Sequence, residues 1–196
     1  PRPLTAWQRG ANANLPGAVT VRGATQVAED FHARFSALSR RYRYLICNDP
    51  VSPAIGADFL AWVRQPLDHE LMHDAAQQLL GEKDFSSFRA AACQSSTPMR
   101  RVDRLDVYRR GNLLVIDIQA NAFLHHMVRN IAGALISVGK GGREPGWLGE
   151  LQALKDRTQA PDTAPAGGLY LVGVDYPDRF GLEPPRPGPW FLPDAD

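Results

Sequence analysis

One arginine lies inside an otherwise apolar and aromatic stretch, N-A-F-L-H-H-M-V-R-N, which runs from Asn121 to Asn130. A buried charge without a partner costs several kcal/mol or more. If Arg129 faces the interior, a carboxylate therefore has to lie opposite it. If Arg129 lies at the edge of a helix instead, a surface acid pairs with it, and the residues alone leave both alternatives open.

Tyr42 and Tyr44 lie in a strongly basic part of the sequence. Residues 1–44 hold seven arginines and two acids, namely Arg2, Arg9, Arg22, Arg34, Arg40, Arg41 and Arg43 against Glu29 and Asp30. Such clustering is compatible with a phosphate-binding face, although a run of charge is also typical of a solvated surface. An aromatic face in this setting can stack on a splayed-out nucleobase. Both tyrosines equally fit ordinary strand aromatics.

Other reactive residue types do not form recognisable sites. His125 and His126 are adjacent, and neighbours on a helix point about 100° apart, so they are poorly placed to chelate one metal ion. Ser86 and Ser87 have no G-x-S-x-G context, which makes a hydrolase triad a poor fit. Cys47 and Cys93 form no C-x-x-C pair and predict neither a disulfide framework nor a zinc knuckle. These residues therefore predict no metal site.

The elements that position these residues follow from periodicity. Alternating runs predict strands at Val19–Ala24, Arg41–Cys47 and Leu169–Asp175, and a β-hairpin at Val102–Tyr108 and Leu113–Ala120. Helical spacing predicts helices at His69–Leu80 after a cap at Asp68, at Phe123–Val138 and at Pro145–Leu154. Residues 1–16 are expected to be loop. The class is therefore α+β with a mainly antiparallel sheet and flanking helices.

Composition excludes few classes of protein. The 196 residues are 44% hydrophobic and 22% charged with a net charge of +1, as in ordinary globular domains. The sequence contains no run of about 18 apolar residues, and Pro1–Gln8 shows no signal-peptide pattern, so no membrane association and a cytoplasmic location are expected.

Three separated segments together resemble the tRNA pseudouridine synthase A family. They are D-F-H-A-R-F-S-A at Asp30–Ala37, which continues into R-R-Y-R-Y, D-F-S-S-F-R at Asp84–Arg89, and F-L-H-H-M-V-R-N-I at Phe123–Ile131. G-L-Y-L at Gly168–Leu171 and V-D-Y-P at Val174–Pro177 agree as well. The resemblance implies the pseudouridine synthase fold and a cofactor-free homodimer. Such an enzyme isomerises uridine in the tRNA anticodon stem-loop, at tRNA positions 38–40.

The resemblance also assigns roles to individual residues. Tyr42 corresponds to the active-site tyrosine that packs against the flipped uracil and helps proton transfer. Arg129 corresponds to the basic partner of the catalytic aspartate, and Leu169 to the apolar residue against the base. The basic segment with Arg34, Arg40, Arg41 and Arg43 is expected to face tRNA phosphates, as a regional inference.

The family's aspartate motif, of the R-T-D-A-G type, does not occur in these 196 residues. The expected organisation is a remnant of an N-terminal half at residues 1–44, a C-terminal α+β domain at 45–183 and a proline-rich tail at 184–196. With the N-terminal half largely missing, the chain alone is expected to be inactive, and an open sheet edge near Val19–Ala24 or Arg41–Cys47 is expected to self-associate. The alternative is a non-catalytic short form that binds tRNA.

Overall fold

The computed structural model describes residues 2–183 and 188–192. These residues fall into two compact units. The smaller unit combines residues 2–37 with residues 176–183, and the larger combines residues 38–175 with residues 188–192. The division comes earlier than the expected boundary after residue 44, because the strand that begins at Ser39 pairs along its length within the larger unit.

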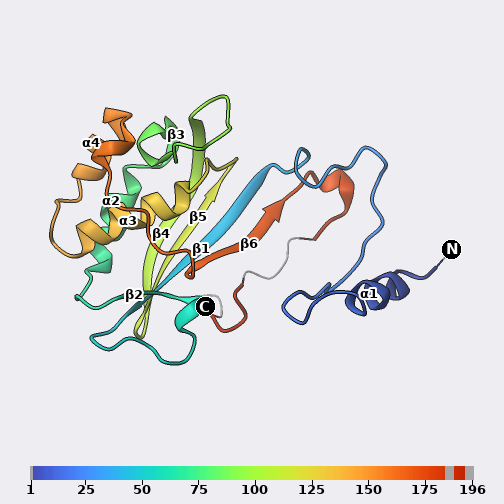
Figure 1. The fold of residues 1–196 in the computed structure, drawn as a ribbon. Helices are drawn as coiled ribbons and strands as arrows, with labels where there is room; N and C mark the ends of the chain where they lie inside the picture. The colour runs from blue at the N-terminus through green and yellow to red at the C-terminus, as the bar shows by residue number, and fades with distance from the viewer. Residues whose placement is uncertain (1, 184–187, 193–196) are drawn as a thin grey trace. The chain divides into compact units, whose positions relative to one another are not determined.

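A mainly antiparallel sheet forms the centre of the larger unit (Figure 1). Its strands run in the order β2-β1-β5-β4-β3, with β6 also paired to β1. They are β1 (Ser39–Asn48), β2 (Ala61–Val63), β3 (Gly81–Asp84), β4 (Met99–Arg110), β5 (Leu113–Ala120) and β6 (Leu169–Asp175). Only the β1–β2 pair is parallel. The predicted α+β class is therefore confirmed.

Three helices cover one face of this sheet, as Figure 1 shows: α2 (His69–Gln77), α3 (Met127–Gly139) and α4 (Trp147–Leu154). Asp68 caps α2 as predicted, because its carboxylate accepts the amides of Glu70 and Leu71. The alternate side chains Tyr44 and Ile46 of β1 point into the core beneath the helices. The hairpin β4–β5 contributes its own alternate apolar positions to the same core.

The opposite face of the sheet is more polar. A small apolar cluster of Leu45, Val115 and Leu192 lies on it, and half-buried residues such as Tyr108 and Tyr170 pack around this cluster. Asp117 of β5 lies on the same face as Val115, since residues two apart in a strand share a face. Of the predicted proline-rich tail, residues 184–187 and 193–196 lie outside the described residues.

The smaller unit corrects two expectations from the sequence. Residues 4–12, expected as loop because turn residues surround them, form helix α1 (Leu4–Asn12), although none of its side chains is buried. Val19–Ala24 is not a strand. The side chain of Asn12 binds both backbone groups of Val21, at 2.7 Å to its amide and 2.9 Å to its carbonyl. These bonds replace a strand partner.

The expected open edge is likewise wrong for β1, because β1 pairs with β2, β5 and β6. The two short strands β2 and β3 were not predicted. None of the helices in residues 2–183 and 188–192 has the length and apolar character needed to cross a membrane.

Candidate active site

The strand pair β1–β6 brings two predicted site residues, Tyr42 and Leu169, to the helix-covered face of the sheet. Leu169 pairs with Tyr44, and the register shifts by one residue between Arg41 and Tyr42. A shift of this kind bends a strand locally and re-aims its side chains. Gly168 makes the close approach of the two strands feasible, because a Cβ there would lie 2.3 Å from the carbonyl oxygen of Leu45. A glycine is therefore required at position 168 on steric grounds.

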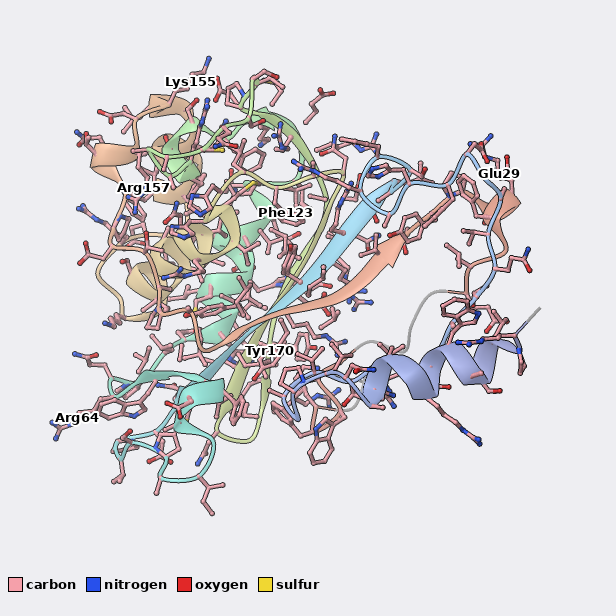
Figure 2. The ribbon with its side chains drawn as sticks, turned by 45° about the vertical axis from the view of Figure 1, so that its right-hand side comes forward. Glu29, Arg64, Phe123, Lys155, Arg157 and Tyr170 are labelled. Atoms are coloured by element: carbon pink, nitrogen blue, oxygen red, sulfur yellow. The ribbon has the colours of Figure 1, made fainter. Side chains whose placement is uncertain are left out.

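One pocket of about 340 Å³ brings together Tyr42, Arg129 and Leu169. Its lining comes from β1, from the turn that leads into α3, from α3 itself and from the segment before β6: Tyr42, Phe123, Leu124, His125, His126, Met127, Val128, Arg129, Ala166 and Leu169. Figure 2 labels Phe123, which lies on the helix side of the sheet. The volume is within the range of small-molecule sites, about 300–1,000 Å³.

Tyr42 is half buried in this pocket, and its ring meets Phe123 edge-on, with centroids 5.0 Å apart and an interplanar angle of 81°. Burial raises the pKa of the Tyr42 hydroxyl above its ordinary value, although Arg40 lowers it in part. The phenol is therefore protonated at neutral pH and can both donate and accept a hydrogen bond. An aromatic face and a neutral hydroxyl in one pocket suit a uracil ring.

Arg129 enters the pocket from the first turn of α3. Its Nε donates to the carbonyl oxygen of Ala164 at 2.7 Å, and its own carbonyl accepts the amide of Ala164 at 3.2 Å. Its side chain is neither fully buried nor exposed. Within residues 2–183 and 188–192, no carboxylate forms an ion pair with Arg129, so neither carboxylate partner considered from the sequence is found in the described part of the chain.

The segment 160–168, which leads into Leu169, is held in place by a buried hydrogen-bond network. Asn130 of α3 is fully buried, and its Oδ1 accepts the hydroxyl of Thr163 at 2.7 Å and Nη2 of Arg157 at 3.3 Å. Its Nδ2 donates to the carbonyl of Phe88 at 2.7 Å. The Tyr44 hydroxyl donates to the carbonyl of Pro165 at 2.7 Å. The pocket wall formed by Ala166 and Leu169 is thus positioned by buried polar groups.

Replacing Asn130 by alanine is expected to destabilise the protein by about 1–3 kcal/mol, because buried polar partners lose their hydrogen bonds. Hydrogen exchange at the Ala164 amide should also accelerate, since Ala164 directly follows Thr163, which Asn130 holds, and its amide donates to the carbonyl of Arg129. Urea denaturation and exchange measured by mass spectrometry check both results. Ser137→Ala is the matched control, because the Ser137 hydroxyl donates to the carbonyl of Gly133 within α3. Unchanged stability and exchange in Asn130→Ala would contradict the network.

The predicted RNA-contacting arginines are differently placed. Arg34 is exposed in the smaller unit, whereas Arg40 is half buried in β1, where its Nη1 donates to the carbonyl of Asn121 at 3.0 Å. Arg41 and Arg43 both donate to the buried Asp117, at 2.6 and 2.7 Å from Arg41 and at 3.0 Å from Arg43. Arg43 is only 2% exposed and presents no guanidinium surface to a phosphate, contrary to the regional expectation.

Reasoning from the sequence missed several pocket residues, among them Phe123, His126 and Ala166. The stretch 123–126 was expected to be helix, but α3 begins at Met127 because His126 adopts a left-handed conformation. The described residues contain no group of three or more His, Cys, Asp or Glu side chains arranged to hold a metal ion.

The comparisons with known proteins agree on one family. A tRNA pseudouridine synthase family model matches residues 75–177. The tRNA pseudouridine synthase A of Actinobacillus pleuropneumoniae serotype 3 is 56% identical over 194 residues, which cover 99% of this chain and 74% of the relative. The enzyme of the same name from Salmonella arizonae is 57% identical over 189 residues, covering 96% of this chain and 70% of the relative. This chain therefore belongs to the tRNA pseudouridine synthase A family of isomerases.

Proposed function

We propose that this chain forms the uracil-binding side of an active site that isomerises uridine to pseudouridine in the anticodon stem-loop of tRNA. The observation that carries the proposal is the convergence of Tyr42, Arg129 and Leu169 on one pocket. Leu169 and Phe123 offer apolar surface to a uracil that has left its stack, and Tyr42 offers an aromatic ring. A base moved out of its stack in this way is accessible to chemistry.

The isomerisation breaks the glycosidic C–N bond and joins the same sugar carbon to a carbon of uracil. That uracil carbon loses a proton, and the nitrogen released from the sugar gains one. A carboxylate is needed at the sugar, and Arg129 is the cation that would orient it and lower its pKa. No aspartate in the 196 residues lies within an R-T-D-A-G-type motif, so we propose that this carboxylate belongs to residues outside them. Tyr42 would assist the proton transfer.

Replacing Tyr42 by phenylalanine tests this assignment in the protein translated from its complete reading frame. The variant is expected to form pseudouridine about 10²–10⁴-fold more slowly, since positioned proton-transfer groups contribute factors of this size. Its affinity for tRNA should stay within about threefold, because the ring that stacks on the base is retained. Release of tritium from tRNA labelled at C5 of uridine measures the rate, and filter binding measures the affinity.

Tyr108→Phe is the control, since Tyr108 is also a half-buried strand tyrosine but lies on the other face of the sheet. Equal rates for Tyr42→Phe and wild type would overturn the role of the hydroxyl. Tight binding of tRNA by the wild type without any tritium release would favour a non-catalytic tRNA-binding protein instead.

The oligomeric state, the cellular location and the contacts with tRNA phosphates remain predictions. We propose a cytoplasmic homodimer in which Arg34, Arg40 and Arg41 contact tRNA phosphates. Sedimentation equilibrium tests the dimer. The salt dependence of tRNA binding tests the phosphate contacts, because each phosphate contact that is lost lowers the slope of log K against log salt concentration by about one.

A further inference from the structure

Two adjacent imidazole rings stack on each other in the lining of the candidate site. The ring centroids of His125 and His126 are 3.9 Å apart, and the ring planes are inclined by 31°. His125 is exposed and His126 is half buried, and both line the pocket that holds Tyr42 and Arg129. No stack of these rings was expected from the sequence, because neighbours on a helix point in different directions. These two residues precede α3 and are not part of it.

The backbone conformation that permits this stack is unusual for its position. His126 has φ 60° and ψ 7°, in the left-handed region that residues other than glycine seldom adopt. Among the described residues other than glycine, only Lys155 shares a positive φ. Lys155 ends α4, where left-handed residues are common. His126 instead precedes the first turn of a helix, where an extended conformation is usual. Unusual backbone of this kind tends to occur at functional sites.

The imidazole of His126 does not cap the helix, since it makes no side-chain hydrogen bond to the first turn of α3. The backbone around the pair is nevertheless fixed. The amide of His125 donates to Sγ of Cys93 at 3.3 Å, and its carbonyl accepts the amide of Ala90 at 3.1 Å. The carbonyl of His126 accepts the amide of Asn130 at 2.9 Å. A rigid backbone therefore presents an exposed ring.

The stack is not suited to binding a metal ion. The lone pairs of an imidazole lie in the plane of its ring, so two rings that are stacked with their planes inclined by 31° direct their nitrogens outward from the stack and not toward one point. Burial, followed by His125 and Arg129, lowers the pKa of His126 below its ordinary value, so this ring is neutral at neutral pH. A rigidly held aromatic face is what a nucleobase stacks on.

We propose that His125 and His126 form a stacking platform for an unpaired nucleobase that flanks the uridine held in the pocket. The proposal rests on the proposed function, since it takes the ligand to be RNA with one base already moved out of its stack. The bases next to that uridine lose a stacking partner when it leaves, and the imidazole face replaces the lost contact. Stacking tolerates any base, so the platform adds affinity without reading sequence.

The test uses variants of the protein translated from its complete reading frame, with an unmodified tRNA transcript as substrate. His125→Gln keeps hydrogen-bonding capacity but removes the ring, and His125→Phe keeps a ring but removes the nitrogens. The glutamine variant is expected to raise KM and the dissociation constant about 10- to 100-fold with kcat nearly unchanged. The phenylalanine variant is expected to restore both constants to within about threefold of wild type.

His126→Gly adds a test that a purely structural role would fail. Glycine adopts the left-handed conformation without strain, so this variant is expected to melt at a higher temperature while it binds tRNA more weakly. Lys155→Gly is the matched control, because it relieves the same backbone conformation at a residue that does not line the pocket. It should raise the melting temperature and leave KM unchanged. Figure 2 labels Lys155 near the end of α4.

Each outcome of these measurements either supports or overturns the proposed platform or the proposed activity. KM values of His125→Gln and His126→Gly within twofold of wild type overturn the platform. A loss of kcat that His125→Phe does not restore overturns it as well, because it indicates a hydrogen-bonding or proton-transfer role. If the wild-type protein binds tRNA but does not form pseudouridine, only the proposed enzyme activity is overturned. The tRNA affinities of the variants then still test the platform. A wild type that does not bind tRNA overturns both proposals.

Discussion

Replacing Arg129 by alanine in the protein translated from its complete reading frame is expected to lower pseudouridine formation by a factor of about 100 or more. The variant removes the arginine that lines the described pocket and with it the cation proposed to orient the catalytic carboxylate. The fold should survive, because among the described residues the side chain makes one hydrogen bond, to Ala164, and a bond of this kind stabilises a protein by about 1 kcal/mol.

Two further variants separate the charge of Arg129 from its anchoring bond. Arg129→Gln can still donate to the carbonyl of Ala164 but carries no charge, so its rate should stay as low as that of the alanine variant. Arg129→Lys keeps the charge and should recover part of the activity, although it lacks the planar guanidinium. Activity in the glutamine variant close to that of wild type would mean that Arg129 serves mainly as an anchor.

The pH–rate profile gives a readout that loss of structure would not mimic. A cation beside a carboxylate lowers the pKa of that carboxylate, so the acidic limb of the wild-type profile should lie at low pH. Without Arg129 the carboxylate stays protonated to higher pH, and the acidic limb should shift upward. Arg104→Ala is the control, because the Arg104 side chain is 47% exposed on β4. An unshifted limb in Arg129→Ala would contradict the proposed pairing.

The strongest periodic patterns in the sequence predicted the elements that the structure contains. The alternation in residues 113–120 matches β5 residue for residue, and Leu169–Asp175 matches β6. The cap at Asp68 marks the start of α2. These signals are local, because burial of one face imposes a period of two on a strand and a period near 3.6 on a helix.

The failures have local causes as well. Helix α1 has Leu4, Trp7 and Ala11 at helical spacing, but it is short and the turn residues Asn14, Pro16 and Gly17 follow it closely, so the sequence pattern predicted a loop. The strand expected at Val19–Ala24 is absent because a side chain, that of Asn12, binds the backbone of Val21. The sequence predicted that α3 begins at Phe123, because the residues from 123 onward are compatible with a helix. The left-handed backbone at His126 excludes that earlier start. Periodicity carries no information on such single-residue conformations.

The candidate site depended on more than local pattern. Tyr42, Leu169 and Arg129 are far apart in the sequence, and only the resemblance to a family predicted that they act together. The pairing of β1 with β6 and the anchoring of segment 160–168 by Asn130 bring them to one pocket. A side chain's partner across a sheet depends on strand register, which the sequence does not reveal. The role of Asp117 as partner of Arg41 and Arg43 was missed for this reason.

Asp117 carries the prediction with the largest effect on stability. Asp117→Asn is expected to lower the free energy of unfolding at pH 7 by about 3–5 kcal/mol, the usual cost of removing one partner of a buried ion pair. The Asp117 carboxylate is only 1% exposed, and it accepts hydrogen bonds from Arg41 and from Arg43, which is itself 2% exposed. The amide that replaces the carboxylate removes the negative charge that faces Arg41 and Arg43 in a buried position.

Asp106→Asn is the matched control, since Asp106 lies directly opposite Asp117 in the β4–β5 pair and also pairs with an arginine, Arg104. The Asp106 side chain is 36% exposed, and exposed ion pairs contribute only about 0.2–1 kcal/mol. Urea denaturation of both variants at pH 7 should therefore show a large loss for Asp117→Asn and a small one for Asp106→Asn. Similar losses in the two variants would show that burial does not strengthen the Asp117 pairs.

The dependence on pH provides an independent test of the same carboxylate. Burial alone raises the pKa of Asp117, but hydrogen bonds and charge from Arg41 and Arg43 outweigh it and hold the pKa below the ordinary value. The stability that results is fully present above the pKa of an unfolded aspartate, about 3.9, and is lost as the pH falls through the lower pKa of the folded state. The wild type should therefore lose stability steeply below about pH 4, while Asp117→Asn, which has no proton to gain there, should lose less over the same range. Parallel acid unfolding of the two proteins would mean that other carboxylates control the transition, because Asp117 can contribute to it only by taking up a proton as the protein unfolds.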